Sequence, residues 1–367
     1  MRVLFTNNAL TGRSGTELYV SDVARRLLAL GHKPMAWSTS IGGLSDELKA
    51  AGIPVVDNLA KLPFQPDIIH GQHHLDTMTA LQCLPGVPAV YVCHGAQPWE
   101  ERPPLFPRIY RYVAVDQACY ERIVNECGID AAKTSIVLNF VDLERFQPRP
   151  PLPAKPRRAL IFSNLARRNR TFKTIRDACA KNGISVEIVG VSAQNISHAP
   201  EKILPQYDLV FAKGRAALEA MAVGCSVIVW NTNGCGPMVT TGEFDRLRAL
   251  NFGYRTCTEP VSAKYISAQI ARYDAADAAA VTRKLRAQTD LRGSVDQIVR
   301  IYESVLAEHQ QTASDPAAES RAAGLYWQRL VPLIKHHPKS IPPPSKRARY
   351  GEKIAQKAEK LARWLRK

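Results

Sequence analysis

Short apolar runs alternate along the chain with longer segments in which apolar residues recur at helical spacing. In the first part of the chain, one helix is predicted from about Glu17 to Leu30, and Gly31 ends it. Strands that alternate with helices indicate a parallel sheet covered on both faces. The apolar runs that predict strands here are Arg2–Thr6, Val55–Val56, Asp67–His70, Ala89–Cys93 and Tyr112–Val115.

A Pro-rich, basic segment, residues 147–158 (QPRPPLPAKPRR), interrupts this alternation and is predicted to be a stiff linker. The pattern then restarts, with a helix predicted over Arg215–Val223 that Gly224 ends. A helical region over about residues 262–309 is expected to close the second half, and the segment NGCGPM after Trp230 is expected to be a loop. The predicted strands of this half are Ala159–Phe162, Ser185–Gly190, Asp208–Ala212 and Ser226–Trp230.

The chain has 367 residues, more than one hydrophobic core usually serves, so two domains are expected. We expect an α/β fold of two doubly wound, Rossmann-like halves, an N-terminal domain over residues 1–150 and a C-terminal domain over residues 151–320. Residues 321–367 are expected to form a helical extension, with one helix over Arg321–Lys335 and a basic amphipathic helix over Tyr350–Lys367.

The net charge of +16 and the pI near 9.6 favour anionic partners, such as nucleotides, nucleic acid or an anionic membrane surface. We find no nucleic-acid recognition motif in the sequence, and the charge is concentrated in the linker, two loops and the tail. The eight cysteines form no CxxC pair and are expected to be reduced core thiols of a cytosolic protein. The N-terminal apolar run is too short to predict a secretion signal, and no run approaches the roughly 20 apolar residues of a membrane-spanning helix.

The end of the chain carries nearly half of the net charge. From Lys346 to Lys367 there are nine Lys or Arg and two Glu, a net charge of +7. A basic amphipathic helix of this kind, with Trp364 beside its apolar face, suits an anionic membrane surface. A helix that packs across the two domains, or one that is solvated, fits the same pattern. The apolar residues that repeat on one helical face are Ile354, Ala358, Leu361 and Leu365.

Two loops of the second half carry basic residues at the ends of predicted strands, where ligands bind in open parallel sheets. One loop is LARRNRTFK, which contains Arg168 and Arg170. The other is AKGRA, where Lys213 and Arg215 flank Gly214, whose small size lets the backbone approach a ligand. Helix N-termini at such loops favour anions, so the two loops are predicted to hold a diphosphate. Solvated surface arginines are the alternative.

Glu219 lies about one helical turn into the helix that follows AKGRA. An acid there has no favourable contact with a diphosphate, but it can accept hydrogen bonds from two vicinal hydroxyls, as on a ribose. An acid that only benefits from the dipole at a helix N-terminus is the alternative.

Five segments in order along the chain carry a family resemblance. Residues 204–237 (LPQYDLVFAKGRAALEAMAVGCSVIVWNTNGCGP) contain Leu218-Glu219-Ala220-Met221-Ala222 and then Gly224. The other four are GRSGTELYVSDVARRLLALGHK with Gly15, VYVCHGAQPW with His94, SIVLNFVDLERFQP, and VEIVG ending at Gly190. In this combination the chain resembles family-4 retaining glycosyltransferases of GT-B fold, in which two Rossmann-like domains face a central cleft.

This resemblance implies transfer of a sugar from a nucleotide-diphosphate donor to a glycan or lipid-linked acceptor, with retention of anomeric configuration and without a metal or other cofactor. Glu219 would bind the ribose, Gly15 would line the diphosphate and acceptor cleft, and His94 would lie beside the donor sugar. It further implies bacterial surface polysaccharide or lipopolysaccharide synthesis, in the cytoplasm or peripherally on the inner face of the membrane. The residues so assigned are His94, Gly15 and Lys213 for catalysis, and Glu219, Gly214, Arg215, Arg168, Arg170, Asn164, Gly190 and Leu218 for donor binding.

The chain departs from the family pattern at several places, and two of them lie beside the residues so assigned. The family's second acid, eight residues before Glu219, is Phe211 here, and the strand before LARRNRTFK ends in Ser163-Asn164 where the family has Gly-Arg. A catalytically weak nucleotide-sugar or glycan-binding module of the same fold is therefore the alternative function. A sugar-nucleotide epimerase of this fold is a third reading, but it calls for more carboxylates around the sugar than the sequence offers.

Three histidines, His70, His73 and His74, stand at the end of a predicted strand in the segment HGQHH. We interpret them as cleft histidines, in line with the family resemblance. A metal site is the alternative, although no cysteine or carboxylate cluster in the sequence completes a zinc ligand set.

Overall fold

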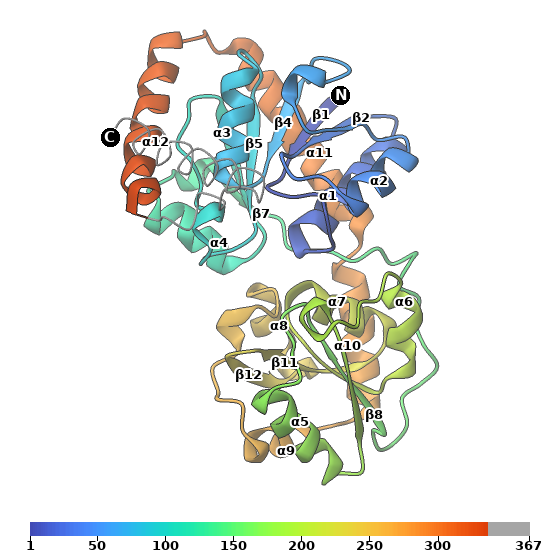
Figure 1. Cartoon of the computed structure of the whole chain (residues 1–367). Helices are drawn as coiled ribbons and strands as arrows, with labels where there is room; N and C mark the ends of the chain where they lie inside the picture. Colours follow the sequence, from blue (N-terminus) through green and yellow to red (C-terminus); the bar gives the residue numbers. More distant parts are fainter. Residues whose placement is uncertain (337–367) are drawn as a thin grey trace, which may run out of the picture. The chain divides into compact units, whose positions relative to one another are not determined.

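The structure is a computed structural model that describes residues 1–336, and its strands form two sheets (Figure 1). The first sheet has seven parallel strands in the order β3-β2-β1-β4-β5-β6-β7. Strands β2 and β7 are missing from the predicted runs, and β2 contains Pro34, which argues against a strand by propensity. The strands are β1 (Arg2–Thr6), β2 (Lys33–Trp37), β3 (Val55–Val56), β4 (Ile68–Gly71), β5 (Ala89–Cys93), β6 (Ile109–Ala114) and β7 (Thr134–Ile136).

Helices connect the strands of the first sheet, and the first of them, α1 (Gly15–Ala29), begins at a capping box. Ser14 accepts a hydrogen bond from the amide of Glu17, and the Glu17 carboxylate accepts one from the amide of Ser14. This cap fixes the point at which the Gly-bearing loop becomes helix. The other helices between these strands are α2 (Gly43–Ala50), α3 (His74–Cys83) and α4 (Gln117–Glu121).

Helix α11 (Leu291–Gln311) packs against the first sheet, although it follows the second sheet along the chain. It contacts β5, β6 and α1. The expectation that the whole region 262–309 closes the second half is therefore wrong for α11. Helical periodicity shows which face of a helix is buried, but it does not show which of the two sheets that face packs against. The buried residues of α11 include Val295, Ile298, Tyr302 and Val305.

The second sheet has five strands in the order β12-β11-β10-β8-β9, with helices on both faces. Alternate residues of β10 point to opposite faces, so Val210 packs in the core under α7 and α10, whereas Phe211 packs under α5 and α9. The predicted doubly wound α/β architecture is thus confirmed. The elements are β8 (Arg158–Phe162), α5 (Arg170–Ala180), β9 (Ser185–Val189), α6 (Pro200–Ile203), β10 (Leu209–Ala212), α7 (Gly214–Val223), β11 (Ser226–Asn231), β12 (Gly234–Met238), α8 (Thr241–Ala249), α9 (Ala263–Ile270) and α10 (Ala275–Gln288).

Strand β12 occupies the segment that the sequence predicts to be a loop. It pairs antiparallel with β11 through a short hairpin in which Asn231 is opposite Gly234. Two glycines and a proline argue against a strand by propensity. Their small size is what the packing requires, because a Cβ atom on Gly236 would lie 2.4 Å from the carbonyl oxygen of Thr256. The loop prediction is therefore wrong, since a close neighbour overrides the local preference.

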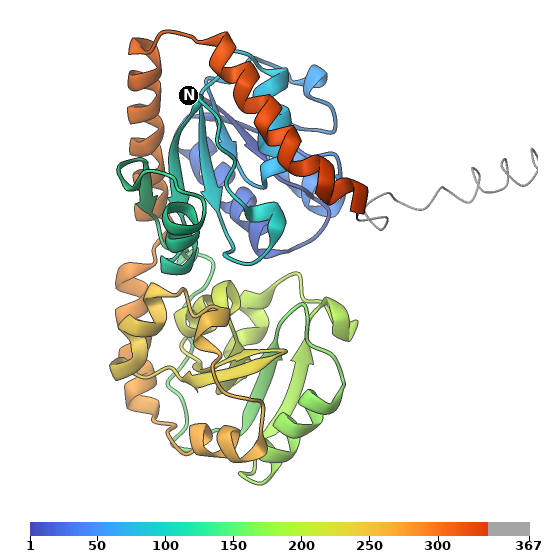
Figure 2. The same ribbon diagram turned by 90° about the vertical axis from the view of Figure 1, so that its left-hand side faces the viewer.

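Both sheets belong to one compact unit, residues 1–104 and 108–314. A second unit comprises residues 105–107 and the chain from residue 315, and its described helix is α12 (Pro316–His336), drawn in red in Figure 2. The predicted domain ranges 1–150, 151–320 and 321–367 remain predictions, and the basic tail over residues 346–367 lies outside the described residues. None of the helices in residues 1–336 has both the length and the apolar composition needed to cross a bilayer.

We expect Gly190→Ala to lower the free energy of unfolding by about 3 kcal/mol, because overpacking in a tight site costs about this much. Gly190 directly follows β9, and a Cβ atom there would lie 1.9 Å from the carbonyl oxygen of Ser163. Chemical denaturation measures the change. Gly183→Ala is the matched control, with open space around its Cβ and only the cost of a positive φ, about 1–2 kcal/mol. Equal losses of unfolding free energy in the two variants would contradict a steric clash at Gly190.

Candidate functional site

The turn from β10 to α7 consists of one residue, Lys213, and brings a helix N-terminus directly to the carboxyl end of a central strand. Gly214 opens the helix with a φ of +56°, a conformation that glycine adopts readily, and its amide donates to the carbonyl of Phe252. The Lys213 side chain makes no capping hydrogen bond. The first turn of α7 therefore presents amides and a positive dipole end beside a cation, an arrangement that favours an anion.

Lys213 is half-buried, and burial lowers the pKa of its ammonium group. A cation that has already lost part of its hydration interacts strongly with an anion that arrives beside it. A Cβ atom built on Gly214 meets no neighbouring atom, so a ligand has room to approach the backbone there. The predicted roles of Lys213 and Gly214 toward a diphosphate fit this geometry and stay predictions.

Arg215 lies between two carboxylates. Its Nε atom donates to Oε1 of Glu219 at 2.8 Å, and its guanidinium also pairs with Asp22 of α1. Although burial works against the charge, the two acids raise the pKa of Arg215, so it stays protonated. Two carboxylates already balance the charge of Arg215. Its contribution to the binding of a diphosphate is therefore smaller than its place in the AKGRA loop suggests.

Glu219 is buried one turn into α7. Burial raises the pKa of its carboxyl group, and Arg215 opposes that rise. A carboxylate offers about four lone-pair sites, so Glu219 can hold Arg215 through Oε1 and still accept further hydrogen bonds. This capacity is what a ribose-binding acid needs.

Phe211, which stands eight residues before Glu219, is fully buried inside β10 and packs in the core under α5 and α9. The connection from β10 to α7 is one residue long, so the position of the family's second acid falls within the strand itself. At that position this chain has an apolar core residue in place of the family's acid.

Glu17 organises the Gly-bearing loop before α1. Its Oε1 accepts hydrogen bonds from the amides of Thr11 and Gly12, and its Oε2 accepts one from Ser14, each at 2.8 Å. These three amides are occupied, so an anion at this loop needs other donors. Gly15, the first residue of α1, is exposed, and a Cβ atom there would meet nothing within 4 Å. This open space fits the predicted role of Gly15 as a lining residue.

His94 follows β5 directly, and a buried acid fixes its backbone. The His94 amide donates to Oε2 of Glu101 at 3.0 Å. The half-buried imidazole meets the ring of Tyr19 edge to face at 4.5 Å, and its buried Nε2 atom has no hydrogen-bond partner among residues 1–336. Burial lowers the pKa of His94 to about 4, with Glu101 opposing the shift, so the ring is neutral near pH 7.

The three histidines of HGQHH have separate neighbours. His70 hydrogen-bonds through Nδ1 to the hydroxyl of Tyr302 in α11, and Nε2 of His73 lies 3.3 Å from Oε1 of Glu101. His74 packs its ring against Trp99 at 4.9 Å. Within the part of the chain that the structure describes, no group of three or more His, Cys, Asp or Glu side chains is arranged to hold a metal ion.

The remaining predicted site residues lie on different elements and in different environments. Arg168 and Arg170 are exposed, and Arg168 lies over the ring of Phe172 at 5.6 Å. Asn164 donates through Nδ2 to the carbonyl oxygen of Arg13 at 3.2 Å, so it links the loop after β8 to the Gly-bearing loop. Leu218 is fully buried in the core under α7, which gives its side chain a packing role.

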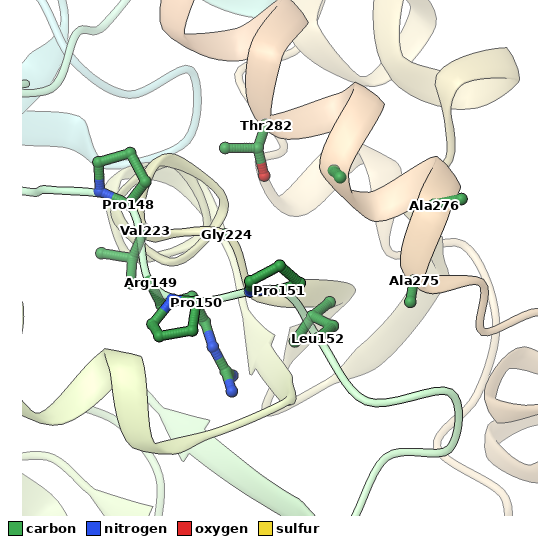
Figure 3. Close-up of a pocket in the computed structure, with 11 residues that line it drawn as sticks. Pro148, Arg149, Pro150, Pro151, Leu152, Val223, Gly224, Ala275, Ala276 and Thr282 are labelled. Carbon is green, nitrogen blue, oxygen red and sulfur yellow. The ribbon is translucent and has the colours of Figure 1, made fainter.

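A separate pocket of about 380 Å³ lies at the other end of α7, beside Val223 and Gly224 (Figure 3). Its wall is mostly apolar, and the guanidinium of Arg149 beside it pairs with Asp208 at 3.1 Å. Helix α7 has ten residues and is therefore about 15 Å long, which separates this pocket from Lys213. It contains none of the predicted site residues.

Sequence reasoning missed Asp22, Glu101, Tyr19 and Tyr302. Asp22 and Glu101 are both buried acids. The position of Asp22 on the buried, mostly apolar face of α1 is the sequence signal that could have identified it. Glu101 follows another acid in a segment without periodicity, so no local signal marks it. Tyr302 reaches His70 across 232 positions of the chain, a distance that no local pattern spans.

Residues 13–145 match the family model described as Glycosyltransferase Family 4. This chain resembles the family-4 glycosyltransferases. The matched segment includes the Gly-bearing loop, α1 and His94, and thus most of the first sheet. No curated protein sequence matches the chain.

Solved structures of glycosyltransferases share the fold. A glycosyltransferase from Rickettsia africae is 15% identical and aligns over 83% of this chain and 98% of its own, with a TM-score of 0.61. The Anabaena protein HepE in complex with UDP is 15% identical over 83% of this chain and all of its own, with a TM-score of 0.62. Sucrose-phosphate synthase from Thermosynechococcus elongatus is 14% identical and aligns over 84% of this chain and 99% of its own, with a TM-score of 0.57. The fold is therefore GT-B, as the sequence predicts.

Proposed function

We propose that this chain is a retaining glycosyltransferase that moves a sugar from a nucleotide-diphosphate donor to a glycan or lipid-linked acceptor. The observation that carries the proposal is the one-residue turn from β10 to α7. It combines an open helix N-terminus, the half-buried Lys213 and the buried Glu219 one turn further on. A diphosphate is stabilised by the first kind of group, and a ribose can donate hydrogen bonds to the second.

In this proposal the diphosphate binds at the N-terminus of α7, where Lys213 and the helix dipole stabilise the charge that develops on the leaving group. A divalent metal is not needed for that purpose, because these groups supply the positive charge. Glu219 accepts hydrogen bonds from the ribose hydroxyls while Arg215 opposes the rise that burial causes in the pKa of its carboxyl group. The exposed Arg168 and Arg170 contribute electrostatic attraction before the donor is bound.

The donor sugar lies beside His94 in this proposal. Its neutral imidazole can hydrogen-bond a sugar hydroxyl without the cost of burying a second charge. Gly15 leaves space for the acceptor and the diphosphate, because no side chain occupies that place. With retention, the acceptor hydroxyl attacks the anomeric carbon on the face from which the nucleotide diphosphate departs, and the departing phosphate oxygen takes the proton.

A catalytically weak nucleotide-sugar or glycan-binding module of the same fold is the second candidate. The observation in its favour is Phe211, a buried core residue at the position of the second acid of the family pattern. Release of nucleotide from a donor sugar in the presence of acceptor separates the two functions, because a binding module releases none.

We place the transfer in bacterial surface polysaccharide or lipopolysaccharide synthesis, on the cytoplasmic side, with the basic tail 346–367 directed at anionic lipid. The related structure of HepE is described in complex with UDP and with UDP-glucose. Uridine diphosphate and its hexoses are therefore the first donors to test.

We expect Glu219→Ala to weaken binding of uridine diphosphate by about 10- to 100-fold, because losing a hydrogen bond to a charged group costs about 1.5–3 kcal/mol. Isothermal titration calorimetry measures the affinity, after a thermal-shift panel of nucleotide diphosphates has identified the base. Asp22→Asn is the matched control, since it removes the other acid on Arg215 and leaves Glu219 in place. Stabilisation by no nucleotide diphosphate would contradict the function, and unchanged affinity in Glu219→Ala would contradict the ribose role.

A further inference from the structure

Three loops at the carboxyl edge of the first sheet are joined by a chain of hydrogen bonds. The amide of Asn8, after β1, donates to Nδ1 of His73 at 3.2 Å, so the proton of this ring is on Nε2. This Nε2 lies 3.3 Å from Oε1 of Glu101, and Oε2 of Glu101 accepts the amide of His94 at 3.0 Å. Since β1, β4 and β5 are neighbouring parallel strands, the loops meet at the edge where open sheets bind ligands.

His73 takes part in this chain from a strained backbone conformation. Its φ is +57°, in the region that favours glycine. A residue with a side chain stays in such a conformation only where its surroundings hold it there, and such residues gather at functional sites. The His73 side chain is 5% exposed and has a partner at each ring nitrogen, Asn8 and Glu101. These two contacts account for a histidine where a glycine would be less strained.

Glu101 is a buried acid that uses both carboxylate oxygens to hold neighbouring loops. Burial raises the pKa of its carboxyl group, but His73 and His94 hold that pKa below its usual range, so the carboxylate is ionised near pH 7. An apolar side chain of similar volume would pack in this place without the cost of removing a charge from water. The acid is therefore explained by the groups that it holds and not by packing.

The loop that carries His94 is held at several points. Glu101 holds the amide of His94, and the buried Arg122 donates to the carbonyl oxygens of Gly95 and Pro98, each at 2.7 Å. A Cβ atom on Gly95 would lie 2.9 Å from Cδ of Pro98, so the loop is also packed closely on itself. A side chain on a loop held in this way has few orientations to sample, which is what a group that must meet a reacting centre requires.

We propose that Glu101 and His73 are positioning residues for sugar transfer, which hold the backbone of His94 so that its imidazole meets the donor sugar in one orientation. This inference rests on the proposed function, because that function is what places His94 beside the donor sugar. Neither Glu101 nor His73 touches the donor, and both act through His94. A group displaced by about 1 Å can lose about 10²-fold in rate, so a loosely held loop slows transfer without weakening nucleotide binding.

The test measures the release of uridine diphosphate from uridine-diphosphate glucose by the full chain, with water as the acceptor. We expect Glu101→Ala to lower kcat by about 10- to 100-fold and to leave the affinity for uridine diphosphate within about twofold. In the His94→Ala background the same substitution should change kcat by less than about twofold, because a residue that acts through His94 has no effect once that ring is gone. Glu101→Gln keeps one acceptor oxygen for the two donors, so its kcat should lie between those of Glu101→Ala and the unmodified protein.

Asp208→Ala is the matched control. Asp208 is also a buried acid that accepts backbone amides and pairs with a cation, but it lies before β10, at the amino edge of the second sheet. Both alanine variants should lower the melting temperature, and only Glu101→Ala should slow release by more than about twofold. His73→Gly removes the ring and relieves the positive φ, so it should slow release about tenfold with a smaller change in melting temperature than Glu101→Ala.

Circular dichroism shows that each variant is folded before its rate is compared. Equal kcat in Glu101→Ala and the unmodified protein would overturn the inference and leave the proposed function intact. Independent effects of Glu101→Ala and His94→Ala, which multiply in the double variant, would do the same, because Glu101 would then not act through His94. No release of uridine diphosphate by the unmodified protein would contradict the proposed function itself, and the positioning role with it.

Discussion

Replacing Arg215 by methionine is expected to lower the free energy of unfolding by about 3–5 kcal/mol, the usual cost of removing one partner from a buried ion pair. Arg215 is the residue between Asp22 and Glu219, whose side chains are only 11% and 6% exposed. Methionine retains much of the side-chain volume, so the loss comes from two buried carboxylates that no longer have their cation. Equilibrium denaturation in urea measures it.

Arg246→Met is the matched control for this prediction. Arg246 also pairs with an acid of its own helix, Glu243, but its side chain is 58% exposed. Exposed pairs contribute about 0–1 kcal/mol, so this variant should lose little stability. A loss in Arg215→Met as small as that in Arg246→Met would mean that water reaches the Asp22–Arg215–Glu219 group freely.

The pH dependence of the Arg215→Met protein follows from the same site. Burial raises the pKa of Glu219, and Arg215 opposes that rise, so removing Arg215 raises the pKa further. A raised folded-state pKa means that the folded protein holds a proton which the unfolded chain has already lost. Stability is then present below the unfolded-state pKa of Glu219 and is lost as pH rises through the folded-state pKa. The variant should therefore recover part of its lost stability on acidification toward the unfolded-state pKa, relative to the unmodified protein.

The part of the proposed donor site that is continuous in the chain is predictable from the sequence. A short apolar strand, a turn with glycine and an amphipathic helix ended by Gly224 appear in one continuous stretch, and the structure has β10, Lys213 and α7 in these places. Each depends on neighbours within a few positions, which is the range that periodicity and capping rules cover. The alternation of strands and helices in both halves follows from the same local signals.

Contacts between residues that are far apart in the chain are not predictable in this way. Arg215 pairs with Asp22, which is 193 positions away, and α11 returns to the first sheet after the second sheet is complete. Strand β12 forms because Gly234 and Gly236 allow a close approach to residues 256–259, against their own propensity. In each case the deciding partner is distant in sequence, and a single chain read by itself carries no signal that pairs the two.

His94→Ala is expected to lower the rate of sugar transfer by about 10²–10³-fold, the usual effect of removing one hydrogen-bonding group from a transition-state site. The affinity for nucleotide diphosphate should stay within about twofold, because His94 follows β5 of the first sheet and the proposed diphosphate groups stand at α7 of the second. Initial rates of nucleotide release with acceptor present, together with calorimetry, separate the two effects. His198→Ala, an exposed histidine in the second half, is the control and should leave both unchanged.

The pH profile of transfer gives a second test of the same residue. Burial lowers the pKa of His94 to about 4, so its imidazole stays neutral from pH 8 down to about pH 5. If the neutral ring hydrogen-bonds the donor sugar, transfer should show no inflection near pH 6.5, and His94→Gln, which retains a neutral donor and acceptor, should recover part of the rate. An inflection near pH 6.5 that disappears in His94→Gln would assign the active form to a titrating, exposed imidazole. The role of His94 would then be proton transfer, and Tyr19 and Glu101 would not hold it in a buried, neutral state.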